Sequence, residues 1–87
     1  MIDALSLSRA LDEAKVGEGP RALALSIYGE PAISFEEAQA RLRVTGRSLL
    51  RYENALLRAG LLKIVIDWVG SGRRRRYDLQ PWRREAA

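Results

Sequence analysis

The chain has 87 residues, 47% of them apolar and 30% charged, and its formal net charge at pH 7 is +4. This length and composition predict one small globular domain, and the absence of cysteine and histidine excludes disulfides, thiolate nucleophiles and histidine-based acid–base or metal chemistry. No apolar run approaches the ~20 residues that span a bilayer, and the N-terminus lacks a secretory pattern, so we expect a cytoplasmic protein without a membrane partner.

A first amphipathic helix is predicted over residues 2–15, with an apolar face of Ile2, Leu5, Ala10, Leu11 and Ala14. This helix either packs on the back of the domain or pairs with a second copy of the chain. A second helix is predicted to begin at Pro20, whose missing N–H suits a first helical position, and to end at Gly29. It is apolar on most sides, which indicates a central, buried position.

The third predicted helix, residues 35–42, follows the pattern of a capping box. The Ser34 hydroxyl accepts a hydrogen bond from the backbone three residues on, and Glu37 reaches back to the Ser34 N–H. Ala38 and Leu42 are expected to be buried, with Phe35 at the edge of the core.

A tight turn at residues 43–45 leads to a fourth helix, predicted over residues 46–59 with Thr45 as its N-cap. Gly60 is a strong signal for its end. The residues expected to point into the core are Leu49, Leu56 and Ala59, with Tyr52 nearby.

Beyond Leu61 the apolar pattern changes to alternation, which predicts a strand with Leu62, Ile64, Ile66 and Trp68 on one face. Gly70-Ser71-Gly72 is typical of a hairpin turn. In the return strand, residues 73–80, Tyr77 and Leu79 share a face with Arg73 and Arg75, and Arg74 and Arg76 lie on the other. Pro81 ends the pairing, and residues 82–87 form a short tail.

Residues 20–80 resemble the winged helix-turn-helix DNA-binding domain of bacterial regulators, the MarR-like and ArsR-like families among them. The resemblance rests on Phe35 to Leu42, on the turn and recognition-helix run Val44-Thr45-Gly46-Arg47-Ser48-Leu49, on Leu56 to Leu62, and on a basic wing from Gly70 to Tyr77. It implies an α+β, mainly α fold, with a three-helix core, a C-terminal β-hairpin wing and an extra N-terminal helix. The implied division is an accessory helix at 1–16, a core at 20–80 and a tail at 81–87.

Two residues depart from the family's pattern. Arg43 occupies a turn position that is commonly glycine, where a positive φ would be costly. Glu53 stands where the recognition helix usually carries a core leucine. We therefore expect Leu50, Tyr52 or Leu57 to fill the space in the core.

The charges are divided unevenly along the chain. Residues 1–40 carry three basic and seven acidic side chains, whereas residues 41–87 carry twelve basic and four acidic ones. Thirteen of the fifteen cations are arginine, whose planar fork binds phosphate and guanine edges at two points. This asymmetry predicts a polyanionic partner for the second half.

The resemblance implies double-stranded DNA as the partner, with the fourth helix in the major groove and the wing on the backbone or minor groove. The outward positions of that helix are expected to be Gly46, Arg47, Leu50, Arg51 and Asn54. The residues predicted to contact DNA are Arg43, Thr45, Arg47, Ser48, Arg51, Asn54, Arg58, Arg73, Arg74, Arg75 and Arg76. The alternative for each arginine is a solvated basic surface, and Thr45 is also a simple cap.

The expected function is that of a small bacterial, phage or mobile-element transcription regulator, with a possible homodimer through the first helix. The rival is an adaptor that docks on an acidic protein partner, such as a polymerase or replication assembly. The wing aromatics Trp68 and Tyr77, and Trp82 of the tail, either close the core or stack on bases. No spacing of serine or threonine with a base indicates an enzyme, and no cofactor or metal motif is present.

Overall fold

Four helices and one β-hairpin make up the part of the chain that the computed structural model describes, residues 3–70 and 72–80. The helices are α1 (Ala4–Ala14), α2 (Glu18–Gly29), α3 (Phe35–Leu42) and α4 (Gly46–Arg58), and the strands are β1 (Leu62–Val69) and β2 (Gly72–Leu79). The predicted places of Ile2, Ser71 and the tail with Trp82 lie outside the described residues.

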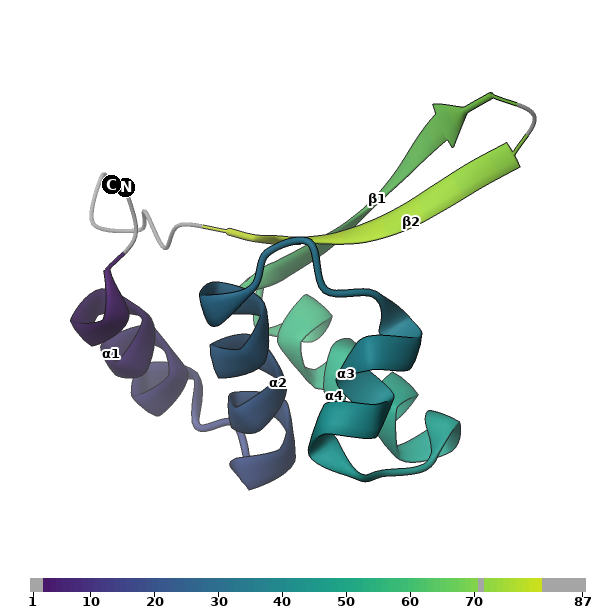
Figure 1. The fold of residues 1–87 in the computed structure, drawn as a ribbon. Helices are drawn as coiled ribbons and strands as arrows, with labels where there is room; N and C mark the ends of the chain where they lie inside the picture. The colour runs from purple at the N-terminus through teal and green to yellow at the C-terminus, as the bar shows by residue number, and fades with distance from the viewer. Residues whose placement is uncertain (1–2, 71, 81–87) are drawn as a thin grey trace.

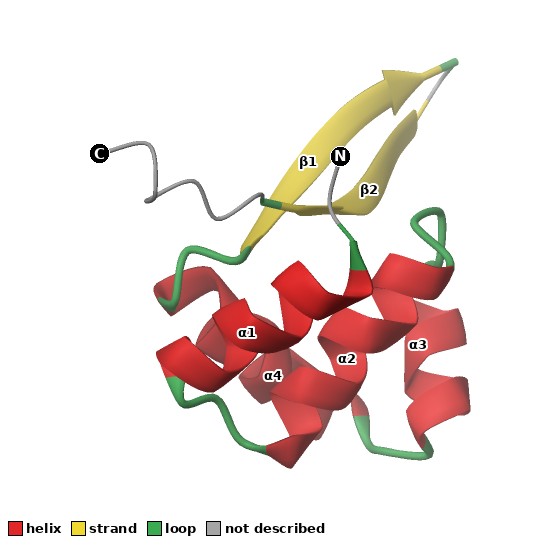
Figure 2. Ribbon diagram, turned by 90° about the vertical axis from the view of Figure 1, so that its left-hand side faces the viewer, coloured by secondary structure: helices red, strands yellow, loops and turns green. Residues whose placement is uncertain are grey.

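The helices surround α2, with α1 on one side of it and α3 and α4 on the other (Figure 1). The two strands pair with each other in antiparallel fashion and extend beyond the helices, so that the turn end of the hairpin lies far from α1 (Figures 1 and 2). This is the predicted α+β, mainly α arrangement of a three-helix core, a hairpin wing and an additional first helix.

Helix α1 begins at Asp3, whose carboxylate accepts a hydrogen bond of 2.7 Å from the backbone N–H of Ser6. Its buried face consists of Leu7, Ala10 and Leu11. The predicted face was wrong at Leu5, which is 61% exposed, because the spacing of the three buried residues turns Leu5 toward solvent. Ala14 is exposed for the same reason. Ala10 and Leu11 are buried as predicted, so helix α1 packs on the helical body through a face that overlaps the predicted one.

Helix α2 begins at Glu18 and not at Pro20 as predicted. Pro20 still lies within the first turn, where backbone N–H groups have no intrahelical partner. Helix α2 is central, as predicted, since it packs against α3, α4 and β2. Not all of its apolar residues are buried, however, since Leu25 on its outer side is 45% exposed.

The start of α3 has the predicted capping box. The N–H of Glu37 donates to Ser34 Oγ at 3.0 Å, and the N–H of Ser34 donates to Glu37 Oε1 at 2.9 Å. The helix ends at Arg43, whose φ of 55° is left-handed. The turn thus adopts the conformation that glycine usually supplies, with an arginine in its place.

Thr45 caps α4 as predicted, with its Oγ1 accepting a hydrogen bond of 3.1 Å from the N–H of Ser48. Leu49 and Leu56 are fully buried. Ala59, predicted to be in the core, is instead an exposed C-cap, because the helix has already ended at Arg58. Gly60 follows with a φ of 75°, as expected for a residue that ends a helix.

The strand register runs from Leu62 opposite Leu79 to Val69 opposite Gly72, so β2 begins and ends one residue earlier than predicted. The face that carries Ile64 and Tyr77 packs against the helices near the base of the hairpin. Toward the turn the same face leaves the helical body. The hairpin is thus anchored at its base and free at its tip, as a wing is.

Candidate nucleic-acid interface

Glu53 is only 2% exposed and occupies the core position at which the family's pattern has leucine. Its carboxylate accepts hydrogen bonds from Arg75, Nη2 to Oε1 at 2.7 Å and Nη1 to Oε2 at 3.1 Å, and a further one from the Tyr77 hydroxyl. A buried carboxylate is tolerated when its charge is paired and its oxygens are satisfied. Of the three residues expected to fill this space, Leu50 and Leu57 are exposed, whereas Tyr52 is half-buried and packs against the core.

The groups around Glu53 are held in their protonated forms. The hydrogen bond to Glu53 raises the pKa of the Arg75 guanidinium, which outweighs the opposing effect of its partial burial. Burial raises the pKa of the Tyr77 phenol, and its hydrogen bond to Glu53 raises it further. Both side chains therefore remain donors at neutral pH, and the cluster links α4 to β2.

Arg75 also lies over the aromatic ring of Phe35, with 5.6 Å between the guanidinium carbon and the ring centroid. Phe35 is the first residue of α3. A single arginine of the wing thus contacts the start of the third helix and the middle of the fourth. These contacts tie the wing to both helices.

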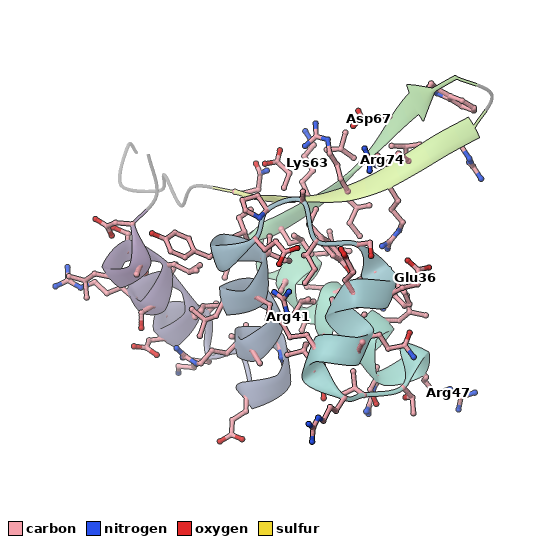
Figure 3. All side chains as sticks on the ribbon, in the orientation of Figure 1. Glu36, Arg41, Arg47, Lys63, Asp67 and Arg74 are labelled. Atoms are coloured by element: carbon pink, nitrogen blue, oxygen red, sulfur yellow. The ribbon has the colours of Figure 1, made fainter. Side chains whose placement is uncertain are left out.

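The four consecutive wing arginines have different surroundings. Arg75 pairs with Glu53, Arg76 Nε donates to Asp67 Oδ2 at 2.7 Å, and Arg73 lies over the ring of Trp68 at 5.9 Å. Arg74 has no ion pair with any acidic residue in the described part of the chain, and it lies with Lys63 and Asp67 along the hairpin (Figure 3). The strand alternation is as predicted, with Arg73 and Arg75 on the face of Tyr77.

The outer face of α4 is basic. Its exposed residues are Arg47, Leu50, Arg51, Asn54, Leu57 and Arg58. Within residues 3–70 and 72–80, no acidic side chain pairs with any of these three arginines. Arg47 points outward from the start of the helix (Figure 3). Gly46, expected on this face, is instead half-buried, with Phe35 and Gln39 within 4 Å of where a Cβ would lie.

The turn before α4 adds one more exposed cation. Arg43 is exposed and has no acidic partner among the described residues. The hydroxyls of Thr45 and Ser48 hydrogen-bond to each other at 3.2 Å, and Arg51 donates to the Ser48 hydroxyl at 3.2 Å. These two hydroxyls therefore order the first turn of α4 and one of its arginines.

Two arginines outside this surface are paired. Arg21 of α2 bonds to Asp12 of α1, and Arg41 of α3 bonds to Glu30 at 2.6 Å. We define the basic surface as Arg43, Arg47, Arg51, Asn54, Arg58, Arg73 and Arg74, from the α3–α4 turn, the outer face of α4 and the wing. Unlike Arg21 and Arg41, its cations form no ion pair with the acidic side chains that the structure describes.

Two residues of this region have roles that sequence reasoning did not assign. Glu53 was noted as a departure, and strand alternation placed Arg75 and Tyr77 on the same face of the wing. That this face meets Glu53 depends on how the wing packs against α4, for which the sequence carried no signal. Trp68 was expected either to close the core or to stack on bases; it is 76% exposed and does not close the core, whereas Tyr77 does. The length by which the wing extends past the helices carried no sequence signal.

Among residues 3–70 and 72–80, no three metal-ligating side chains gather into a group that could hold an ion. None of the described helices has the length and apolar character needed to cross a membrane.

Comparison with known proteins identifies the fold. No protein-family model matches the chain, and no curated protein matches it. Among solved structures, the chain is similar to a crystal structure of MarR, with a TM-score of 0.68 and 21% sequence identity. The match covers 94% of this chain and 58% of the MarR chain. The chain therefore has a winged helix-turn-helix fold like that of MarR.

Proposed function

We propose that this protein binds double-stranded DNA, with α4 in the major groove and the wing on the neighbouring backbone or minor groove. The observation that carries the proposal is the basic surface, on which the arginines of α4 and Arg74 of the wing lack acidic partners among the described residues. A duplex supplies a row of phosphates along its backbone with which such cations can pair. The role we propose is that of a small transcription regulator in the cytoplasm.

The outer face of α4 has the residue types that read base edges. Arg47 and Arg51 lie one turn apart on the helix, a like-charge arrangement that costs a few tenths of a kcal/mol without an anion between them. In a major groove, arginine bonds to guanine O6 and N7, and Asn54 has the amide that pairs with adenine. Leu50, 48% exposed between them, suits a thymine methyl group.

Other residues of the basic surface suit the phosphate backbone. Arg43 lies just before the N-terminus of α4, and Arg58 lies in its last turn, so the two flank the base-reading residues. The N-terminus of α4 also favours an anion through its free N–H groups and its dipole, and Thr45 and Ser48 lie there. Such contacts fix the register of the helix in the groove.

The wing arginines have separate roles in this proposal. Arg74 contacts phosphate, whereas Arg75 is retained by Glu53 and holds the wing at its angle to α4. The exposed Arg76–Asp67 pair is weak enough for Arg76 to exchange Asp67 for phosphate.

The acidic residues of the first 40 positions lie mainly on α1, α2 and α3. Pairing of two copies through α1, with each copy reading one half of a palindromic site, remains a prediction.

The test is fluorescence anisotropy with a labelled duplex of random sequence at low salt. Wild-type protein is compared with Arg47→Ala/Arg51→Ala, and the matched control is Arg9→Ala/Lys15→Ala, which removes two exposed charges from α1 and its end. We expect the α4 variant to lose at least roughly tenfold in affinity, because each charged contact contributes about 1 kcal/mol or more. The control should bind like the wild type.

Failure of the wild type to bind the duplex at low salt would reject the proposal. Equal losses in the two double variants would show that only net charge matters and would remove the role of α4. Binding to an acidic protein in place of DNA would instead favour an adaptor, and its complex would survive competition by excess duplex.

A further inference from the structure

We infer that the wing inserts Trp68 into the minor groove, where the indole ring stacks against a base step. The inference rests on the proposed function and adds to it a contact with bases that is not electrostatic. Trp68 is 76% exposed, the highest exposure among the large apolar side chains of the described residues. It lies opposite Arg73, next to the Val69–Gly72 pair that closes the hairpin.

The exposure of the inner wing face rises steadily toward the tip. Tyr77 opposite Ile64 is buried against the helices, Ile66 in the next position is 46% exposed, and Trp68 after it is 76% exposed. The three strand positions share one face because side chains alternate along a strand. Trp68 therefore extends the face that contacts α3 and α4 beyond the body of the protein.

The surroundings of Trp68 indicate a nucleic acid in preference to an apolar protein surface. Arg73 covers part of the ring at 5.9 Å from its centroid, and it forms no ion pair with an acidic residue of the described part of the chain. A nucleic acid satisfies both kinds of group at once, because its phosphates pair with arginine while its bases stack on aromatic rings. An apolar protein partner would have to bury the Arg73 guanidinium without an anion.

The shape of the tip suits a minor groove. Gly70 and Gly72, which flank Ser71 at the end of the two strands, have nothing within 4 Å of a hypothetical Cβ, so no side chain covers the backbone of these two glycines. A narrow two-stranded end with small residues enters a groove that a helix does not fit. Apolar side chains that enter the minor groove insert at base steps and partly unstack them. Such insertion favours flexible pyrimidine–purine steps, which unstack at low cost.

Arg73 acts as a positioning residue for Trp68. The cation–π contact occupies one side of the indole and limits its rotamers, while the high exposure of the ring leaves its other side open to a base. Holding the ring before binding reduces the entropy lost on insertion. Arg73 also brings a positive charge to the place where phosphates line the groove.

The experiment uses the full chain with Trp82→Phe, so that Trp68 is the remaining tryptophan of the two in the sequence. Two duplexes of equal length serve as probes, one built of repeated TA steps and one of A-tracts. We expect quenching of the Trp68 fluorescence on binding, stronger with the TA duplex. Trp68→Ala should lose roughly tenfold in affinity for the TA duplex at every salt concentration, with an unchanged salt slope, because stacking involves no counterion release.

Trp68→Phe should retain more affinity than Trp68→Ala, since a smaller ring still stacks. Leu5→Ala, which removes another exposed apolar side chain, is the control and should bind like the parent protein. Binding without quenching and without loss in Trp68→Ala would overturn the inference and leave the proposed function intact. Equal quenching by both duplexes would overturn insertion at a base step. Absence of binding by the parent protein would overturn both proposals.

Discussion

Glu53 of α4 and Arg75 of β2 form a two-point ion pair, with nitrogen–oxygen distances of 2.7 and 3.1 Å, at the place where the wing leaves the helices. The two residues are 22 positions apart in sequence, and the pair joins the helix proposed to read DNA to the hairpin proposed to accompany it. The Tyr77 hydroxyl completes the cluster. Arg75 belongs to a run of four arginines that the sequence predicts to contact DNA, yet it pairs with a buried carboxylate of the protein itself.

Replacing Glu53 by alanine is expected to lower the free energy of unfolding by about 2 kcal/mol, because the Tyr77 hydroxyl and Arg75 lose their acceptor. The Arg75 side chain is 37% exposed, so water relieves part of the cost. Urea denaturation followed by circular dichroism measures the change. Asp67→Ala, which breaks an exposed ion pair, is the control and should cost less than about 1 kcal/mol. Equal effects of the two substitutions would contradict the role given to Glu53.

Because the pKa of Tyr77 is raised in the folded protein, the free energy of unfolding should depend on pH in the alkaline range. The folded state holds the phenolic proton above the ordinary pKa of 10.0, while the unfolded chain releases it there. The stabilisation is thus complete below pH 10 and is lost as the pH rises toward the folded pKa, at about 1.4 kcal/mol per pH unit. Urea midpoints at rising pH should fall more steeply for the wild type than for Tyr77→Phe. Parallel curves would show that Tyr77 does not titrate in this way.

Gly19 allows α2 to approach α4 closely. A Cβ on this residue would lie 2.2 Å from Cε1 of the half-buried Tyr52 ring, so the ring would have to move. Gly19→Ala should therefore destabilise the protein by about 1–2 kcal/mol. In Gly29→Ala, at the other end of α2, the added methyl meets nothing within 4 Å, and stability should be unchanged or slightly raised. A thermal scan that ranks the two variants in the opposite order would refute this packing.

Arg43 and Lys15 both end helices in the left-handed conformation, with φ of 55° and 57°. Substitution of either by glycine should raise stability by about 0.5–1 kcal/mol, since the relief of strain exceeds the entropy cost of glycine. Only Arg43→Gly should weaken binding to a random duplex, because Arg43 belongs to the basic surface. Melting temperatures and anisotropy titrations of the two variants separate the effects. A gain in stability with undiminished DNA affinity in Arg43→Gly would exclude Arg43 from the interface.

Features encoded by neighbouring residues could be predicted from the sequence. The bounds of α3, its capping box at Ser34 and the Thr45 cap follow from hydrogen bonds between residues three positions apart. The exposed arginines of α4 follow from helical periodicity in the same way. The errors at Pro20 and Ala59 concern helix ends, where one or two residues of difference cost little energy.

Features that depend on distant residues could not be predicted in the same way. Leu5 was misplaced because the face that α1 buries is decided by the helices it packs against. The burial of Glu53 depends on Arg75 and Tyr77, which only the folded chain brings to it. The exposure of Trp68 depends on how far the wing extends past the helices. The division of the arginine run into paired and unpaired members follows from these contacts.

The salt dependence of binding to a random duplex tests most directly whether the basic surface holds DNA. Each phosphate that the protein neutralises contributes about −0.9 to the slope of log affinity against log salt. We predict a steep slope for the wild type, reduced in magnitude by about 1.8 in Arg58→Ala/Arg74→Ala. The slope should be unchanged in Arg9→Ala/Lys15→Ala. A wild-type affinity that does not depend on salt, or equal slope changes in the two double variants, would contradict the claim.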